Sequence, residues 1–366
     1  MIRLLPMYIL LPIMRNVVIR DNKMIRDAQE VLRARLPDGW RAVFDEAEDA
    51  RDDKGADARL QVSGPDGRAA CLSVYSRRSL QPRGVLVLRA QLQDVPPDNP
   101  MVVAPYLSFS VRERLVEAGL GFVDLTGNVR VALSTPGLFI EASGADVNPE
   151  RSARPSRSLR GDKAGRIVRA LIDRKEPSGV RALAAVTGVN PGYVSRIVAM
   201  LDDQALIARS GRGRIVSVDW PRLLERWSQD APLSSRGKPT MCLEPRGLAA
   251  LTLRLGTSSL HYAVTGTLAV SGLAPVAAAH LAVVYVDNAH AAVSALDLRI
   301  AERGANVMLI EPGDDWVFTG SALRNGLSAV AISQAATDLL TSPGRGPAEA
   351  EALIAWMGEN ERAWRG

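Results

Sequence analysis

The sequence predicts a multidomain α+β protein. Its 366 residues are enough for two or three domains of ordinary size. Apolar residues make up 47% and charged residues 23% of the chain, which is ordinary globular usage and excludes a wholly disordered, collagen-like or polytopic membrane protein. Polar segments at 148–160 and 230–239 interrupt the apolar pattern and are interpreted as linkers. They separate predicted domains at 24–147, 161–229 and 240–366.

Residues 1–23 are interpreted as an N-terminal extension. The stretch 4–14 is apolar, but its 11 residues are too few to span a bilayer, and Pro6 and Pro12 interrupt a helix. No small-residue cleavage site follows, which disfavours a secretory signal. We therefore expect a cytoplasmic protein without a membrane partner, and Met24, which opens the first convincing helix, is an alternative start.

The cysteines and histidines indicate no disulfide framework and no metal site. Cys71 and Cys242 form no CxxC motif, which favours a reducing compartment. His261, His280 and His290 match no zinc spacing and are interpreted as packing or surface residues. We expect no cofactor.

The first predicted domain begins with a helix over 24–36, where apolar residues recur at helical spacing. Short apolar runs separated by glycine and proline turns follow and predict a sheet. Its strands are expected at 59–63, 70–75, 84–90, 101–105, 122–125, 129–133 and 138–140, with a further helix at 110–118.

The middle domain is predicted to contain three helices and a hairpin. Gly188 is suited to end the second helix, and Asn190 can cap the third, with Pro191 at its first position. Apolar stripes place the helices at 163–174, 179–186 and 191–203, and two apolar stretches place the hairpin over 207–218.

The third predicted domain has less regular patterning. Apolar runs predict strands at 281–287, 305–310 and 316–318, and a helix or strand at 262–270. Helices are expected at 291–301, 333–340 and 348–358.

Positive charge is concentrated in the middle of the chain. Residues 151–226 contain 16 Lys/Arg against seven Asp/Glu, whereas the whole chain has a net charge of only +5. A helix that enters the major groove needs a small, polar or basic outward face, and basic residues on a hairpin lie along phosphates or a minor groove. The candidate DNA-binding residues are Asn190, Tyr193, Ser195 and Arg196 on the third helix, Arg209, Arg212 and Arg214 on the hairpin, and Lys163 and Arg166 on the first helix.

The string GVNPGYVSRIVAMLDDQALI at 188–207, followed by the basic hairpin, resembles the winged helix-turn-helix domains of bacterial transcriptional regulators. The resemblance implies binding to double-stranded DNA. The residues alone leave open a small helical adapter domain with a solvated basic face, because Ser and Asn side chains also cap helices.

The first domain carries the strings VVAPYLS at 102–108, GLGFVDLTGNVRVAL at 119–133 and PGLFIEASG at 136–144. These strings resemble the N-terminal part of antitoxin-like regulators of the AbiEi type. Asp124 and Asn128 lie within them and are interpreted as hydrogen-bonding residues of a turn and a strand end.

The strand order of the first domain also resembles the restriction-endonuclease-like fold. Such enzymes place an Asp on one strand and a Glu-x-Lys on the next, to hold Mg²⁺ and activate water. Asp57 fits the first acid, but Ser73 and Tyr75 stand near the Glu and Lys positions. The resemblance therefore implies a degenerate nuclease-like domain without catalytic residues.

The third domain resembles a nucleotidyltransferase frame, with Thr265-Gly266-Thr267 followed by a strand that ends at Asp287. Tyr285 stands where the first metal-binding aspartate belongs, so catalysis is disfavoured. Gly313-Asp314-Asp315 is interpreted as a solvated turn. The same domain is similar to the C-terminal domain of AbiEi-type antitoxins, which implies contact with a toxin or an effector.

Together these patterns predict a sequence-specific DNA-binding transcriptional regulator of bacterial type that is not an enzyme. We expect a homodimer, because two winged helices on one duplex read two short half-sites, which together are far more specific than one. Two alternatives stay open. One is an antitoxin that neutralises a partner toxin and binds DNA for autoregulation, and the other is a metal-dependent nuclease or nucleotidyltransferase, disfavoured by its missing carboxylates.

Overall fold

The computed structural model describes residues 23–44, 56–93, 99–146, 148–149, 158–175, 179–210, 213–274 and 278–366. The chain is a mixed α+β protein that divides into two compact units, Met1–Pro155 and Ser156–Gly366. We call them the N-terminal unit and the C-terminal unit. The division falls inside the polar segment 148–160.

The N-terminal unit contains a seven-stranded sheet whose strand order follows the chain order. The first three strands are antiparallel, the next two pairings are parallel, and the last two are antiparallel. The strands are β1 (Arg41–Phe44), β2 (Ala58–Ser63), β3 (Ala69–Ser76), β4 (Met101–Ala104), β5 (Gly121–Asp124), β6 (Val129–Leu133) and β7 (Leu138–Ala142).

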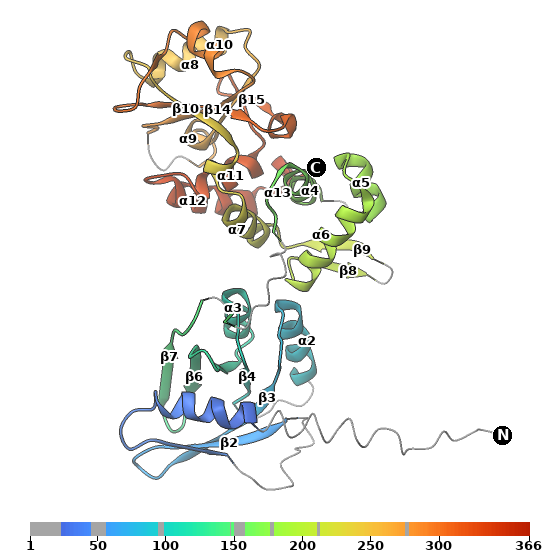
Figure 1. Ribbon diagram of the computed structural model, residues 1–366, viewed down its shortest axis with the longest axis vertical. Helices are drawn as coiled ribbons and strands as arrows, with labels where there is room; N and C mark the ends of the chain where they lie inside the picture. The colour runs from blue at the N-terminus through green and yellow to red at the C-terminus, as the bar shows by residue number, and fades with distance from the viewer. Residues whose placement is uncertain are drawn as a thin grey trace, which may run out of the picture. The chain divides into compact units, whose positions relative to one another are not determined.

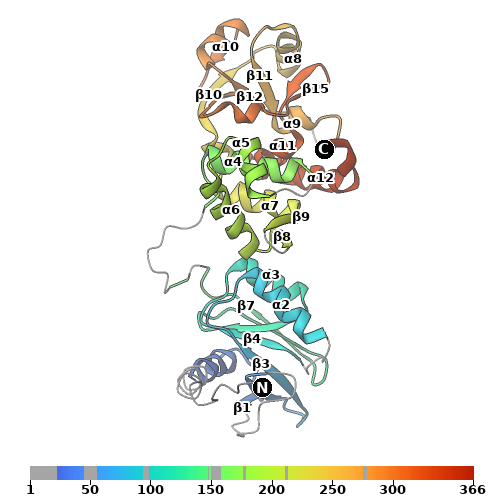
Figure 2. The ribbon, with the colours of Figure 1, turned by 90° about the vertical axis from the view of Figure 1, so that its right-hand side faces the viewer.

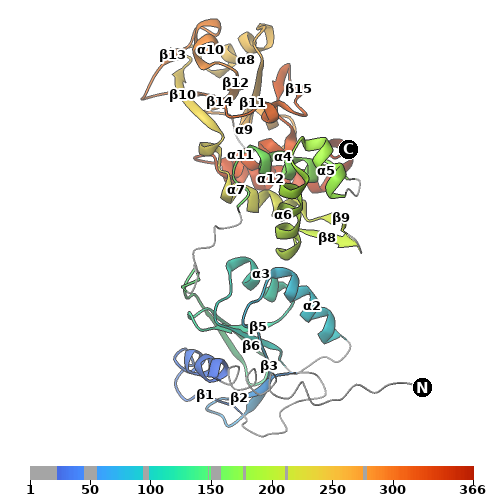
Figure 3. The same cartoon turned by 45° about the vertical axis from the view of Figure 1, so that its right-hand side comes forward.

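Helices cover both faces of this sheet (Figures 1 and 3). The helical residues 23–33 bury their apolar side chains on one face. Helices α2 (Pro82–Gln93) and α3 (Phe109–Glu117) bury theirs on the other face and form the two crossovers between the parallel strands. Each face therefore has its own hydrophobic core.

The strand predicted at 84–90 is wrong, because this segment is part of helix α2. Its alternating valines and leucines look like a strand, but the residues that are buried, Val85, Leu88 and Leu92, recur at helical spacing. Leu86 and Val87 are about half exposed. The helix also supplies the connection that the parallel pair β3 and β4 requires, which local sequence does not reveal.

The C-terminal unit opens with the predicted order of three helices and a hairpin. These are α4 (Asp162–Asp173), α5 (Val180–Thr187), α6 (Pro191–Asp203), β8 (Ile207–Ser210) and β9 (Arg214–Val218), followed by α7 (Trp220–Asp230). Gly188 ends α5 with a φ of 65°, and the Asn190 side chain caps α6 by accepting a hydrogen bond from the backbone N–H of Gly192 at 2.8 Å. Both terminal signals are confirmed.

A second seven-stranded sheet completes this unit, in the order β13-β10-β14-β12-β11-β16-β15 with mixed pairing. Helices α8 and α10 lie on one face, and α9, α11 and α12 lie on the other (Figures 1 and 2). The strands are β10 (Gly237–Leu243), β11 (Tyr262–Thr265), β12 (Ala282–Val286), β13 (Arg299–Ile300), β14 (Val307–Pro312), β15 (Ala322–Arg324) and β16 (Leu327–Ala329). The helices are α8 (Leu248–Thr257), α9 (Gly266–Val270), α10 (Ala289–Ala295), α11 (Ile332–Leu340), α12 (Gly346–Glu359) and α13 (Glu361–Trp364), with 3-10 turns η1 (Leu233–Ser235) and η2 (Asp315–Phe318).

Three sequence predictions in this unit need correction. The segment 316–318 is the 3-10 turn η2 and not a strand, because the Asp314 side chain caps it by accepting from the Trp316 N–H. The helix predicted over 291–301 is shorter, since α10 ends at Ala295 and β13 follows. The segment 230–239 is not a linker, because it contains η1 and the first residues of β10, an interior strand of the sheet.

The helices α4 to α7 and the sheet share one hydrophobic core. Helix α11 packs against α4, α7 and the sheet strand β11. Helix α4 lies close to Trp316, because residue 165 is glycine and a Cβ there would come within 2.6 Å of the indole ring. The end of the chain also joins this core, since Gly366 exchanges backbone hydrogen bonds with Asp173 and Lys175. Among the helices in the described ranges, none is long and apolar enough to cross a membrane.

Candidate nucleic-acid interface

Helix α6 has one buried face and one exposed face. Val194, Ile197, Val198 and Leu201 are buried in the shared core, whereas Ser195 and Arg196 are exposed and Tyr193 is half-buried. Asn190 is exposed at the N-terminus of the helix, where its side-chain oxygen serves as the cap. The structure thus brings together the four residues that the sequence singled out on this helix.

Arg196 is held next to Tyr193. Its guanidinium carbon lies 5.6 Å from the centre of the Tyr193 ring, one turn earlier on the helix. Among the described residues, no carboxylate forms an ion pair with Arg196. The side chain therefore presents its positive charge and its hydrogen-bond donors to solvent from the N-terminal half of α6.

The hairpin β8–β9 lies beside α6 in all three views (Figures 1, 2 and 3). Arg209 is half-buried and pairs with the carboxylate of Asp202 at 3.7 Å, so it ties the hairpin to α6. Arg214 is exposed at the start of β9. Arg212 lies outside the described residues. Gly213 has a φ of 102°, and a Cβ there would come within 2.6 Å of an Arg209 nitrogen, so glycine fits this turn.

Lys163 and Arg166 lie on α4, beside the segment that contains Asp314 and Trp316. Arg166 Nη2 donates to both carboxylate oxygens of Asp314, at 2.5 and 2.6 Å, across 148 positions of sequence. Lys163 is exposed, next to Asp162, which accepts a hydrogen bond from Trp316 Nε1. Asp314 is therefore half-buried, as an ion-pair partner and the cap of η2, whereas Gly313 and Asp315 beside it are exposed, as the sequence predicted for this turn.

In the N-terminal unit, Asp57 is engaged by its neighbours. Its Oδ2 atom accepts from the backbone N–H of Ser76 at 2.7 Å and from Arg77 at 3.2 Å. Ser73 and Tyr75, which stand near the Glu and Lys positions of a nuclease, are buried in β3. The carboxylate of Asp57 is thus paired with Arg77, and β3 contains no second acid that could hold a metal ion with it.

Asp124 and Asn128 form a buried hydrogen-bond network, which confirms the sequence interpretation. Asp124 accepts hydrogen bonds from the backbone of Leu107, Thr126 and Asn128, at 2.9 to 3.0 Å. Asn128 accepts in turn from Gly144 and Arg112. Both side chains are fully buried, and they fix the turn between β5 and β6.

The nucleotidyltransferase-like position in β12 is filled by a buried polar cluster. Tyr285 and Thr265 both donate hydroxyl hydrogen bonds to Oδ2 of Asp338, at 2.9 and 2.8 Å, and Arg236 lies 3.4 Å from Oδ1. Burial raises the pKa of the Tyr285 hydroxyl well above its usual value, and burial also raises the pKa of Asp338, against the lowering influence of Arg236. Over the described ranges, no group of three or more His, Cys, Asp or Glu side chains is placed to hold a metal ion.

The surface histidine prediction is confirmed for all three residues. His261, His280 and His290 are exposed. His261 pairs with Asp287 at 2.9 Å and lies against the ring of Phe318, with 4.2 Å between ring centres.

Comparison of the chain with protein-family models, with curated proteins and with solved structures finds no match. Any functional conclusion therefore rests on the residues and their geometry.

Proposed function

We propose that this protein is a sequence-specific DNA-binding transcriptional regulator. In this proposal α4 to α6 and β8–β9 act as a winged helix-turn-helix, with α6 in the major groove and the hairpin on the phosphate backbone. The N-terminal unit, with its degenerate nuclease-like arrangement, takes no catalytic part in the proposal.

The exposed N-terminal half of α6 carries this proposal. A recognition helix contacts base edges with residues near its N-terminus, and Arg is the side chain that most often reads guanine, through two parallel hydrogen bonds. Arg196 is exposed and lies against Tyr193, and Ser195 and Asn190 are exposed as well. The helix is rigidly placed, because its opposite face is buried in the shared core.

The basic hairpin supports a backbone-binding role. Arg214 is exposed, and Arg209 is held at the junction with α6 by Asp202. Contacts of this kind fix the position of a protein on the duplex without reading its sequence. They also make binding salt-dependent, because each neutralised phosphate releases counterions.

The test is a fluorescence-anisotropy titration of the full chain with its own upstream DNA and with a scrambled duplex of equal length. Arg196→Ala is expected to weaken binding to the upstream DNA by about 1–3 kcal/mol and to leave scrambled-DNA binding nearly unchanged. Arg214→Ala is expected to weaken binding to both duplexes equally and to reduce the salt dependence.

Arg299→Ala is the matched control. This arginine is exposed on β13, at the edge of the second sheet, and its loss changes the net charge by the same amount. Equal affinity of the wild type and Arg196→Ala for the upstream DNA would reject the base-reading role. Equal effects of Arg214→Ala and Arg299→Ala would reject the backbone role of the hairpin.

A further inference from the structure

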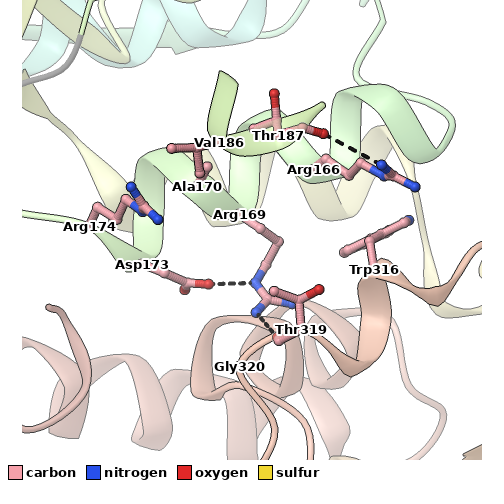
Figure 4. A pocket seen from close by; sticks show the side chains of 10 residues that line it. All are labelled: Arg166, Arg169, Ala170, Asp173, Arg174, Val186, Thr187, Trp316, Thr319 and Gly320. Atoms are coloured by element: carbon pink, nitrogen blue, oxygen red, sulfur yellow. Dashed lines mark hydrogen bonds and ion pairs between the residues drawn. The ribbon is translucent and has the colours of Figure 1, made fainter. Parts of the chain in front are cut away.

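The C-terminal unit contains a cavity of about 340 Å³ between the proposed DNA-reading helices and the segment 316–320 (Figure 4). This volume lies within the range of small-molecule sites. Its walls come from three places, which are one side of α4, the last turn of α5, and η2 with the residues after it. None of the residues proposed to contact DNA from α6 or the hairpin lines it.

Three arginines line the cavity, two on α4 and one directly after it, and they differ in how many hydrogen bonds their guanidinium groups make. Arg169 is structural, since it is buried and bonds Asp173, Gln334 and the Thr319 carbonyl. Arg166 is bonded to Asp314 through Nη2, but its Nε is buried without a hydrogen-bond partner among the described residues.

Arg174 is exposed at the end of α4, and no carboxylate in the described ranges forms an ion pair with it. Figure 4 shows Arg174 and Arg166 at opposite ends of the cavity, with Arg169 between them. The one lining carboxylate, Asp173, is already paired with Arg169 at 2.8 Å. The lining therefore has unused donors and an excess of positive charge.

The remaining wall is apolar. Val186 is about half exposed although it is a large aliphatic residue, and it faces the cavity together with Ala170. The indole of Trp316 adds an aromatic surface. Apolar walls with a few convergent polar groups are typical of sites that bind organic molecules, and guanidinium groups select carboxylates or phosphates.

We propose that this cavity binds a small organic anion with a flat apolar body, and that its occupancy controls DNA binding. The anionic group interacts with Arg174, and the apolar body packs against Val186 and Ala170 and extends toward Trp316 and Arg166 at the other end. The control of DNA binding rests on the function proposed above, whereas the binding site itself does not.

The cavity has a direct connection to α6. Val186 and Thr187 are the last residues of α5, and the turn that follows them leads into Asn190 and α6. Arg166 Nη1 donates to the Thr187 carbonyl at 3.5 Å, while its Nη2 binds Asp314. A ligand whose body fills the cavity as far as Arg166 displaces the guanidinium and competes with both contacts. It therefore shifts the position of the α5–α6 turn relative to the rest of the unit.

The binding test uses phenyl phosphate as the probe, titrated into the full chain and followed by ligand-observed NMR. Phenol supplies the ring without the charge, and inorganic phosphate supplies the charge without the ring. Phenyl phosphate is expected to bind at least about tenfold more tightly than either, because both parts of the lining contribute. Binding no tighter than that of inorganic phosphate overturns the site.

The variants are Arg174→Gln and Lys175→Gln. The two side chains are adjacent and exposed and lose the same charge, but only Arg174 lines the cavity. Arg174→Gln is expected to weaken phenyl phosphate binding about tenfold, whereas Lys175→Gln is expected to retain the wild-type affinity. Equal losses in the two variants overturn the assignment of the anion to Arg174.

The regulatory part is tested by repeating the DNA titration at saturating phenyl phosphate. We expect a several-fold change in the DNA dissociation constant of the wild type and none in Arg174→Gln. An unchanged constant in a protein that binds phenyl phosphate overturns the regulatory role and leaves the site standing. A protein that binds phenyl phosphate but binds no DNA overturns the proposed function instead.

Discussion

Among single residues, the buried pair of Arg236 and Asp338 stands out because neither charge is near water. Asp338 is fully buried, and the side chain of Arg236 is about 4% exposed. The Arg236 guanidinium lies over the Trp227 ring at 4.2 Å and near that of Trp316 at 5.7 Å. Isolated buried charges are costly, so this cluster depends on keeping every partner in place.

This pair predicts an unusual dependence of stability on pH. Burial raises the pKa of Asp338 above its usual value of 3.8, so the folded state holds this proton to a higher pH than the unfolded state does. The contribution of Asp338 to the free energy of unfolding is therefore largest below 3.8 and falls as pH rises toward the folded pKa. The slope is at most about 1.4 kcal/mol per pH unit.

The Asp338→Asn substitution removes the titrating group and with it this dependence of the unfolding free energy on pH. We expect the difference in unfolding free energy between wild type and variant to decrease as pH is raised from about 4 to about 7. Urea unfolding followed by tryptophan fluorescence measures it, because five of the six tryptophans lie in the C-terminal unit. The exposed Asp315→Asn is the control for the same chemical change. A wild-type-minus-variant difference that is constant over this pH range contradicts the prediction.

Among the elements, α6 was the most predictable and α2 the least. Gly188, Asn190 and Pro191 mark the start of α6 within a few residues. The apolar residues that follow recur only at the spacing of a helix. The α2 segment has valines and leucines on exposed as well as buried positions, so its pattern does not distinguish a helix from a strand. Its helical state depends on the crossover between two strands, which is a tertiary requirement.

The cap of α6 gives a second prediction. Asn190→Ala removes the acceptor for the Gly192 N–H and is expected to lower the free energy of unfolding by about 0.5–2 kcal/mol. Asn190→Ser keeps an acceptor oxygen and is expected to stay close to the wild type. Urea unfolding of the three proteins checks this order. If alanine and serine prove equally stable at this position, the cap contributes nothing.

At the scale of the whole molecule, the individual helices and strands could be predicted from the sequence better than the boundaries between domains. The segment 230–239 has the polar composition of a linker, but Leu233 and Arg236 within it are buried. The cavity could not be predicted from local sequence patterns either, because Arg166 and Asp314 are 148 positions apart and only the fold brings them together. The polar groups of the α6 surface, by contrast, follow one another along a single helix and could be found from spacing alone.

The shared core predicts that helices α4 to α7 do not fold as a separate domain. A fragment of residues 156–229 leaves the Trp227 side chain without Arg236 and Trp316, which cover it in the whole unit. It is expected to lose its cooperative thermal transition and its near-ultraviolet circular dichroism, whereas a fragment of residues 156–366 keeps both. A sharp melting transition in the shorter fragment would show that the two parts are independent after all.

The close approach of α4 to Trp316 has a consequence for how such a chain diverges. A lineage that acquires a side chain at position 165 loses the space that the indole occupies, unless position 316 changes to a smaller residue as well. Positions 165 and 316, which are 151 positions apart, are therefore expected to covary among homologues. If the function proposed above holds, the exposed positions of α6 instead vary together with the DNA sequence that is bound.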